Sequence, residues 1–276
     1  MKNCIQTFLL FSLILLLNCC KDQNYDKRQK AIGETELEIT YINNEGFIIT
    51  SKEKKIIIDG LLSFNISEEN KQKMVKAEPP FNNTDLILAT HDHADHFDAN
   101  IVGGHLLNNE MAIFISTEQA LEELQSEFDK FSDISDRVLS IYPKEGEKIL
   151  KTINGIELEI YNLRHGMNSH IQNLGFHIYI DGKRILHIGD AQELTTDDLK
   201  VNGIYDKKID IAFMPYWYLI YKDDREVFND IIHGSKIIAM HLGWVDEGIE
   251  GISDKIKVVF PEANIFNRSL ELKIFK

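Results

Sequence analysis

Three histidines and two aspartates fall within six residues of this chain, and no other segment constrains its fold and chemistry as strongly. The run is His91-Asp92-His93-Ala94-Asp95-His96, and it directly follows the apolar run 86–89. Imidazole and carboxylate are the ligands that borderline divalent ions such as Zn²⁺ prefer. In an extended segment, alternate side chains share one side, so His91 and His93 can bind one ion together. A turn after them would direct Asp95 and His96 towards a second ion.

The first 35 residues differ in character from the rest of the chain. The apolar stretch 5–17 follows Lys2 and has the length of a signal-peptide core, but it is too short to span a bilayer comfortably. We therefore predict a lipoprotein-type signal peptide over 1–18, a polar tether over 19–35 and one folded domain over 36–276.

The residues around Cys19 indicate an exported, lipid-anchored protein of the bacterial cell envelope. Leu16-Leu17-Asn18-Cys19 resembles a bacterial lipobox, in which the cysteine becomes the lipidated first residue. Asn18 departs from the small residue that usually stands there. Processing at Cys20, an uncleaved membrane anchor and an ordinary export signal therefore stay open as alternatives.

Cysteine usage and charge exclude several classes of function. The three cysteines all lie at or before position 20, so the predicted domain has no thiol nucleophile, no zinc–thiolate site and no intrachain disulfide. The formal net charge is −14 at pH 7, and such a surface repels polyanions. We expect a small-molecule substrate and no nucleic-acid partner. The sequence gives no indication of the oligomeric state.

Hydrophobic patterning predicts two strand-rich segments with helices between them. Strands are expected over 37–42, 46–50, 55–60, 85–90, 111–116, 156–163, 176–180, 184–188, 209–214, 236–240 and 270–275. Asp181-Gly182 is a typical hairpin turn between two of them. Helical spacing appears over 66–77, 117–131 and 226–233. This order favours two stacked sheets flanked by helices.

Four of the predicted strands end at a side chain that can bind a metal ion. These side chains are His91, His165, Asp190 and His241. Because neighbouring strand ends form a rigid scaffold, we expect the four to lie close together. His170 follows His165 by five positions and is the alternative third histidine; His165 is favoured because it directly follows its strand. Tyr216, Trp217 and Tyr218 follow another strand end, where they either line a substrate pocket or form a partly buried aromatic cluster.

This arrangement resembles the metallo-β-lactamase superfamily. The resemblance covers residues 36–275 and rests on the HxHxDH run, a distant histidine, a Gly-Asp after a hairpin and a late histidine. Segments 172–176 and 187–191 are similar to metal-dependent hydrolases related to ascorbate-phosphate lactonases. The implied fold is an α/β class with α+β type layering, a four-layer αββα sandwich with its site at one edge of the two sheets.

The resemblance also implies a role for each site residue. The first ion would be held by His91, His93 and His165, the second by Asp95, His96 and His241, and Asp190 would bridge both ions. Asp59 matches the family's early strand-end aspartate and would support the ligands from outside. His187, beside Gly189-Asp190, either supports the ligands in the same way or packs in the core.

The chemistry expected from such a site is hydrolysis. A hydroxide bridged by two divalent ions is nucleophilic at neutral pH because metal binding lowers the pKa of water to about 7. Asp95 is the residue expected to orient it. Zinc is the favoured metal, with manganese or iron as alternatives. The bond cleaved would be an ester, lactone, amide or phosphoester in a small molecule. The alternatives are a di-iron redox protein and a non-catalytic, anchored metal-binding protein.

Overall fold

The computed structural model describes residues 36–166, 170–242 and 248–276, together with side chains except at 248–250. Glu36–Lys276 forms one folded unit. The predicted signal peptide and tether, with Cys19 and Cys20, lie outside the described residues, so they stay predictions. Within the described part of the chain, no helix is long and apolar enough to cross a membrane.

The first sheet has seven strands in the order β13-β1-β2-β3-β4-β5-β6. Strands β13 to β3 run antiparallel to their neighbours, and β3 to β6 run parallel. Their bounds are β1 Leu37–Asn43, β2 Gly46–Thr50, β3 Lys55–Ile58, β4 Leu86–Leu88, β5 Ile113–Ser116, β6 Val138–Ser140 and β13 Leu272–Phe275.

The second sheet has six strands in the order β12-β11-β10-β9-β8-β7. It is antiparallel from β7 to β10 and parallel from β10 to β12. The bounds are β7 Lys148–Ile153, β8 Ile156–Asn162, β9 Leu174–Ile180, β10 Lys183–His187, β11 Ile211–Pro215 and β12 Lys236–Met240. Asp181 and Gly182 join β9 to β10 at φ 45° and 79°, which is the left-handed pair that a tight hairpin turn requires.

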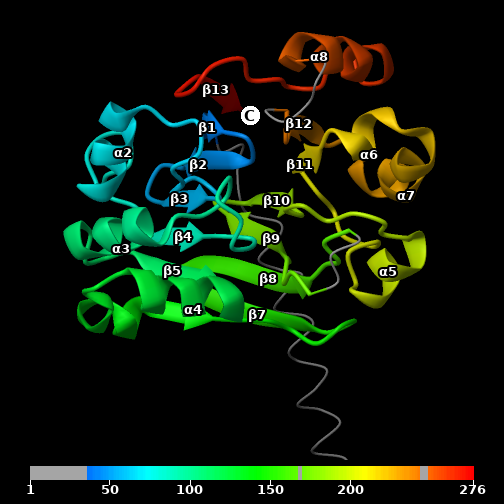
Figure 1. The fold of residues 1–276 in the computed structure, drawn as a ribbon. Coiled ribbons are helices and arrows are strands. Elements are labelled where there is room, and N and C mark those ends of the chain that lie inside the picture. The colour runs from blue at the N-terminus through cyan, green and yellow to red at the C-terminus, as the bar shows by residue number, and fades with distance from the viewer. Residues whose placement is uncertain (1–35, 167–169, 243–247) are drawn as a thin grey trace, which may run out of the picture. The chain divides into compact units, whose positions relative to one another are not determined.

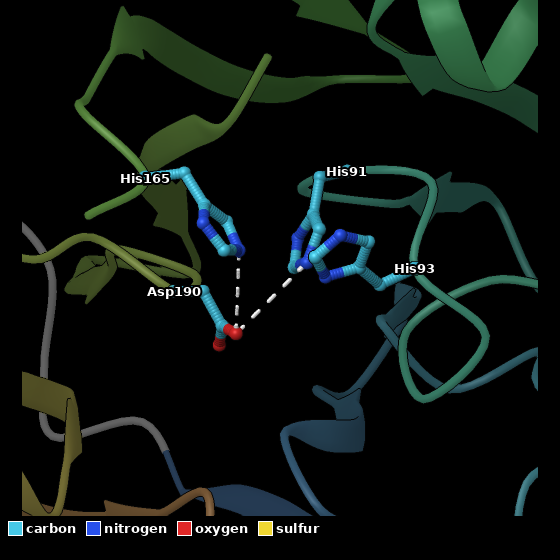
Figure 2. Close-up of side chains that lie close together, drawn as sticks. All are labelled: His91, His93, His165 and Asp190. Atoms are coloured by element: carbon cyan, nitrogen blue, oxygen red, sulfur yellow. Dashed lines mark ion pairs between the residues drawn. The ribbon is translucent and has the colours of Figure 1, made fainter. Parts of the chain in front are cut away.

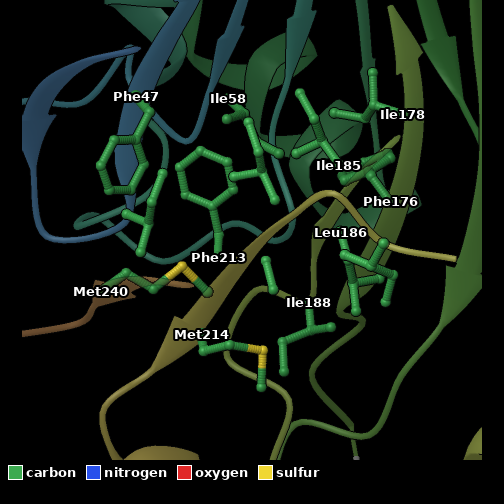
Figure 3. Close-up of a cluster of buried hydrophobic side chains, with 14 of the residues drawn as sticks. Phe47, Ile58, Phe176, Ile178, Ile185, Leu186, Ile188, Phe213, Met214 and Met240 are labelled. Atoms are coloured by element: carbon green, nitrogen blue, oxygen red, sulfur yellow. The ribbon is translucent and has the colours of Figure 1, made fainter. Parts of the chain in front are cut away.

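The two sheets pack face to face through alternating apolar residues. On β3, Ile56 and Ile58 enter the core between the sheets, whereas Ile57 enters a second core beneath helices. The rings of Phe47 on β2 and Phe213 on β11 lie 4.7 Å apart and join the sheets directly (Figure 3). Because successive side chains of a strand point to opposite faces of the sheet, one strand contributes to two separate cores.

Helices cover both outer faces, which completes four layers (Figure 1). The first sheet is covered by α2 Glu68–Val75, α3 Ala99–Asn108 and α4 Glu118–Glu127, with short 3₁₀ turns at Phe131–Asp133 and Ser135–Arg137. On the side of the second sheet lie α5 Thr196–Val201, α6 Trp217–Ile220, α7 Lys222–Ile232 and, packed against α6, α8 Gly248–Val259. The predicted αββα layering is confirmed.

Several elements have no counterpart in the sequence prediction, among them α3, β6, β7 and α5. Helix α3 contains Gly103 and Gly104, which weaken any helical pattern. An added Cβ would lie 2.3 Å from the ring of Phe128 at the first and 2.8 Å from Val75 at the second. Close helix packing, rather than propensity, explains these glycines. Strand β7 lies at a sheet edge and is mostly exposed, so it lacks a clear apolar alternation.

Candidate metal centre

The strand ends of both sheets meet at one edge, and the predicted ligands lie there. His91 and His93 follow β4 in the first sheet, whereas His165 and Asp190 follow β8 and β10 in the second (Figure 2). His241 follows β12, whose direction matches that of β10 because β10, β11 and β12 are parallel. The sequence argument that strand ends converge therefore agrees with the geometry.

One group of donor atoms is formed by His91, His93, His165 and Asp190, with every atom within 4.8 Å of the others. The three imidazole rings lie 4.6 to 4.9 Å apart, centre to centre. Asp190 Oδ2 lies 3.9 Å from His91 Nε2 and 3.6 Å from His165 Nε2. These atoms are close enough to share one ion.

A second group is formed by Asp95, His96 and His241 on the other side of Asp190. His96 Nε2 lies 3.5 Å from Asp95 Oδ2 and 3.4 Å from Asp190 Oδ1. His241 Nε2 lies 3.3 Å from Asp190 Oδ2 and 3.9 Å from Asp95 Oδ2. The Asp190 carboxylate thus faces both groups, as a bridging ligand must.

Asp59 fixes the orientation of this site from beneath. Its buried carboxylate accepts from the backbone N–H of Thr90 at 2.7 Å, from the Thr90 hydroxyl at 2.8 Å and from His96 Nδ1 at 3.1 Å. Because His96 donates from Nδ1, its Nε2 is the nitrogen left to bind an ion in the second group. Such a carboxylate–histidine pair is the usual way to set the tautomer of a metal-binding histidine.

Thr90 sets the tautomer of His91 in the same way. The Thr90 hydroxyl gives its proton to Asp59, so the hydroxyl oxygen accepts from His91 Nδ1 at 3.0 Å. The Nε2 atom of His91 is then left unprotonated and faces Asp190. Asp59 therefore orients a histidine of each group: it binds His96 directly, and it orients His91 through the Thr90 hydroxyl.

His187 and Asn173 hold the turn that carries Asp190. His187 Nδ1 accepts from the Gly189 N–H at 3.2 Å, so its Nε2 donates to the Glu45 carbonyl at 3.3 Å. Asn173 accepts from the Asp190 N–H and donates to the carbonyls of Leu163 and Ile188, each at 3.2 Å. His187 thus supports the site through backbone groups, and Asn173, which the sequence analysis did not single out as a site residue, ties together the ends of β8 and β10.

Gly189 is required by this close packing. Its φ of 55° lies in the left-handed region, and an added Cβ would lie 2.4 Å from Asn173 Oδ1 and 2.7 Å from Thr90 Cβ. The backbone before Asp190 can approach the β4 loop only because no side chain intervenes.

The turn between β1 and β2 contributes two residues that sequence reasoning missed. Asn44 donates from Nδ2 to Asp95 Oδ2 at 2.7 Å, and its carbonyl accepts from the His241 N–H at 3.2 Å. Glu45 is fully buried, and its carboxylate lies within 4.8 Å of the donor atoms of Asp190 and His241. Burial and the charge of Asp190 raise the pKa of Glu45 well above its ordinary value. No metal-binding motif marks Asn44-Glu45, so only tertiary structure finds them.

His170, the alternative to His165, does not join the two groups. Its side chain is exposed, and its carbonyl accepts from the Gln119 side chain at 2.7 Å. His165 is buried, and its ring contacts those of His91 and His93. The geometry therefore places His165, rather than His170, beside the other predicted ligands.

The electrostatics of the site act in opposite directions on the pKa values of its two buried histidines. Burial and the neighbouring His96 lower the pKa of His91 well below its ordinary value, so its imidazole is neutral. Although burial opposes it, the charges of His96 and His241 hold the pKa of Asp190 well below its ordinary range. Burial also works against the charged form of His96, yet Asp190 and the hydrogen bond to Asp59 raise its pKa well above normal. A proton on His96 would leave when an ion binds.

The buried atoms that lack hydrogen-bond partners identify where an ion fits. Among the described residues, the unpaired buried atoms include the Nε2 atoms of His91, His96 and His165 and Oδ1 of Asp190. Buried polar atoms are ordinarily hydrogen-bonded. Here the atoms that lack partners face one another and come from residue types that bind divalent ions, so the donor set fits a metal centre.

The three aromatic residues after β11 divide between the site and the core. The Trp217 ring lies 5.0 Å from that of His241, edge to face, and its Nε1 donates to the Ala191 carbonyl at 3.0 Å. The Tyr216 ring lies 6.4 Å from His241. Trp217 and Tyr218 are both buried and belong to the hydrophobic core, where Tyr218 packs against Phe228, whereas Tyr216 is only partly buried.

Comparison with known proteins bears on the family and the fold of this chain. The sequence profile of the β-lactamase superfamily domain matches residues 38–229. A metal-dependent hydrolase of Pyrobaculum islandicum is 25% identical over 217 residues, covering 74% of this chain and 84% of that protein.

Two solved structures share the fold. A possible metal-dependent hydrolase of Veillonella parvula has a TM-score of 0.60 at 18% identity, with 86% of this chain and 98% of that one covered. A diiron β-hydroxylase of Streptomyces venezuelae has a TM-score of 0.51 at 12% identity, covering 88% of this chain and 54% of that one.

Proposed function

Because this chain belongs to the β-lactamase superfamily, we propose that it is a metal-dependent hydrolase with a two-ion centre that cleaves an ester, lactone, amide or phosphoester bond in a small molecule. One observation carries the proposal. The unpaired nitrogen and oxygen atoms of His91, His96, His165 and Asp190 are buried and converge at the edge of two sheets. The relative from Pyrobaculum islandicum is named a metal-dependent hydrolase, which supports the reaction class.

The two donor groups divide the ligands between two positions. His91, His93 and His165 would hold the first ion, and Asp95, His96 and His241 the second, with Asp190 between them. Divalent ions bound there would lower the pKa of water and polarise the bond under attack. Asp59 and Thr90 keep His91 and His96 in the tautomers that such binding needs.

Asp95 is the residue proposed to orient the attacking water. Although burial opposes it, the hydrogen bond and charge of His96 lower the pKa of Asp95, so the carboxylate stays ionised. Asn44 donates to Asp95 Oδ2 and holds it in place. A carboxylate so held can accept a hydrogen bond from water at the second position. An Asp95→Asn protein with full metal content and full activity would contradict this role.

The substrate is proposed to be a small molecule that binds beside His241. Trp217 presents its ring edge to face with the imidazole of His241, and Tyr216 lies next to it. Trp217 is fixed by its hydrogen bond to the Ala191 carbonyl, one residue after Asp190. An anchored aromatic ring next to a ligand can contact the apolar part of a substrate.

The test combines metal analysis with a substrate panel. The purified full chain and a purified fragment of residues 36–276 are stripped of metal and reloaded with Zn²⁺, Mn²⁺ or Fe²⁺. Each is then assayed on chromogenic esters, lactones, amides and phosphodiesters. We expect two ions per chain and hydrolysis of at least one class. Two irons with a visible charge-transfer band and no hydrolysis would instead favour a redox protein. Inactivity with every metal would favour a binding role.

We also propose that the protein acts at the bacterial cell envelope, anchored through a lipid on Cys19. Support comes from the sequence alone: an apolar stretch over 5–17, a lipobox-like Leu16-Leu17-Asn18-Cys19 and a polar stretch that separates them from the folded unit. Processing at Cys20, an uncleaved membrane anchor and an ordinary export signal remain the alternatives. No nucleic-acid partner is expected from the net charge of −14.

A further inference from the structure

Glu45 is a buried acid with one long ion pair and no hydrogen bond to its carboxylate in the described part of the chain. Its residue is 0% exposed, and neither carboxylate oxygen has a hydrogen bond among the described residues. A buried carboxyl group that lacks hydrogen-bond donors is ionised only beside a cation and otherwise keeps its proton, in agreement with the raised pKa of Glu45. Two of the groups that face it, Asp59 and Asp190, are carboxylates themselves. The basic atom nearest to it is His96 Nδ1, 4.0 Å from Oε2, and this atom already donates to Asp59.

The β1–β2 turn holds this side chain inward. Gly46 is pressed against the end of β3, where an added Cβ would lie 2.5 Å from the Asp59 carbonyl oxygen. Asn44 has a φ of 47° and is tied to Asp95 by its side chain and to His241 by its carbonyl. Asn44 thus binds two residues of the second donor group, Asp95 and His241. Glu45 lies in the turn between Asn44 and the closely packed Gly46.

The donor atoms around Glu45 show which side an ion would occupy. Glu45, Asp59 and His187 lie close enough to form a group, but both nitrogens of His187 are used by the Gly189 N–H and the Glu45 carbonyl. Both oxygens of Asp59 accept hydrogen bonds. In the other group, of Glu45, Asp190 and His241, Asp190 Oδ1 and both Glu45 oxygens lack partners.

We propose that Glu45 is a further carboxylate ligand of the second ion, which makes that position richer in oxygen than the first. This inference rests on the two-ion centre proposed above. The first position has three imidazoles and Asp190. Around the second, His241 is shared by the group of Asp95 and His96 and by the group of Glu45 and Asp190. An ion bound by both of these groups would have three carboxylates and two imidazoles. Carboxylate oxygen suits Mn²⁺ better than imidazole does. The preference for zinc over manganese is therefore weaker at the second position than at the first.

The experiment measures metal binding without substrate. Metal-free wild-type chain and the Glu45→Gln variant are titrated separately with Mn²⁺ and Zn²⁺ by calorimetry, and bound metal is counted after dialysis. We expect one of the two sites to lose at least about tenfold in Mn²⁺ affinity and less in Zn²⁺ affinity, with the other site unchanged. Two sites with wild-type affinities for both metals would overturn the proposal.

Two further variants separate ligation from burial. Glu159→Gln removes another buried carboxylate, which belongs to neither donor group, and should keep both ions. Glu45→Asp keeps the charge but shortens its reach, so it should fold and still weaken the second site; wild-type binding in this variant would also count against ligation. A wild-type chain that binds two ions but hydrolyses nothing would refute the hydrolase proposal and leave the role of Glu45 intact.

Discussion

Replacing Asp59 by asparagine tests how far the site depends on a residue that would bind no ion. The wild-type carboxylate accepts three hydrogen bonds, two of them at Oδ2, from the Thr90 hydroxyl and His96 Nδ1. In Asp59→Asn, an NH₂ group takes the place of one oxygen. If the remaining oxygen of the variant side chain keeps its hydrogen bond from the Thr90 N–H, the new NH₂ group faces two other donors, the Thr90 hydroxyl and His96 Nδ1. The Thr90 hydroxyl can rotate and accept from it, but His96 can accept only by moving its proton to Nε2.

The lost charge of Asp59 and the proton shift on His96 determine how much stability and metal affinity the variant loses. A hydrogen bond to a charged group contributes about 1.5–3 kcal/mol and a neutral one about 0.5–1.5 kcal/mol, and the three bonds to the Asp59 carboxylate all become neutral in the variant. We expect the metal-free variant to lose about 2–4 kcal/mol in its free energy of unfolding. With a proton on Nε2, His96 no longer offers a lone pair towards Asp95 and Asp190. The affinity for the second ion should fall about 10- to 100-fold.

The assays are urea unfolding of the metal-free chain and calorimetric titration with Zn²⁺. Asp85→Asn is the matched control, because Asp85 also accepts from a backbone N–H, that of Lys55 at 2.9 Å, but lies outside both donor groups. The control should lose stability and keep both ion affinities. If Asp59→Asn bound two ions as tightly as wild type, the tautomer argument for His96 would be refuted.

Three further predictions address the turn, the charges and the N-terminus. Gly189→Ala should lower the free energy of unfolding by about 2–4 kcal/mol and weaken metal binding, because its Cβ would meet Asn173 and Thr90; unchanged urea and metal titrations would contradict this. Although burial opposes it, hydrogen bonds from Lys148, Lys207 and Tyr161 hold the pKa of Glu159 to about 2 against an ordinary 4.5. Its stabilisation is therefore complete above pH 4.5 and is lost as the pH falls to 2, so Glu159→Gln should cost about 2–3 kcal/mol at pH 7 and little near pH 2, as followed by unfolding across pH. Cys19→Ser should abolish labelling of the full chain by radioactive palmitate in a bacterial host while Cys20→Ser does not; the reverse result would assign processing to Cys20.

The layers of the fold could be predicted because most of the strands, though not β6 and β7, carry their own signal. Ile56, Ile57 and Ile58 show why: a short apolar run bounded by polar residues indicates a strand buried on both faces. The strand ends then followed, and with them the proximity of His91, His165, Asp190 and His241. Helix α3 could not be predicted, because its two glycines reflect contacts with Phe128 and Val75 that a sequence does not display.

The residues that were missed at the site act through contacts distant in sequence. Asn173 joins Leu163 to Ile188 and Asp190, and each of these bonds depends on two strand ends lying side by side. Asn44 lies 51 positions from Asp95, to which it donates. A periodic pattern reports which face of an element is buried, but it does not report which turn closes over that element.

Backbone conformation shows why such turns accompany the ligands. Asn44, Asp59 and His241 have φ values of 47°, 46° and 60°, in a region that costs a residue with a side chain about 1 kcal/mol or more. Each follows the end of a strand, where a left-handed residue turns the chain sharply away from the sheet. The Asp59 N–H then donates to Leu88, and the His241 N–H donates to Asn44, so hydrogen bonds between separate strand ends offset the strain. The side chains of these three turns contact the donor groups at the edge where β4, β8 and β10 end: Asn44 contacts Asp95, Asp59 contacts His96 and His241 contacts Asp190. A chain that folded without this strain would direct the same side chains along its strands, and the donor atoms would not meet.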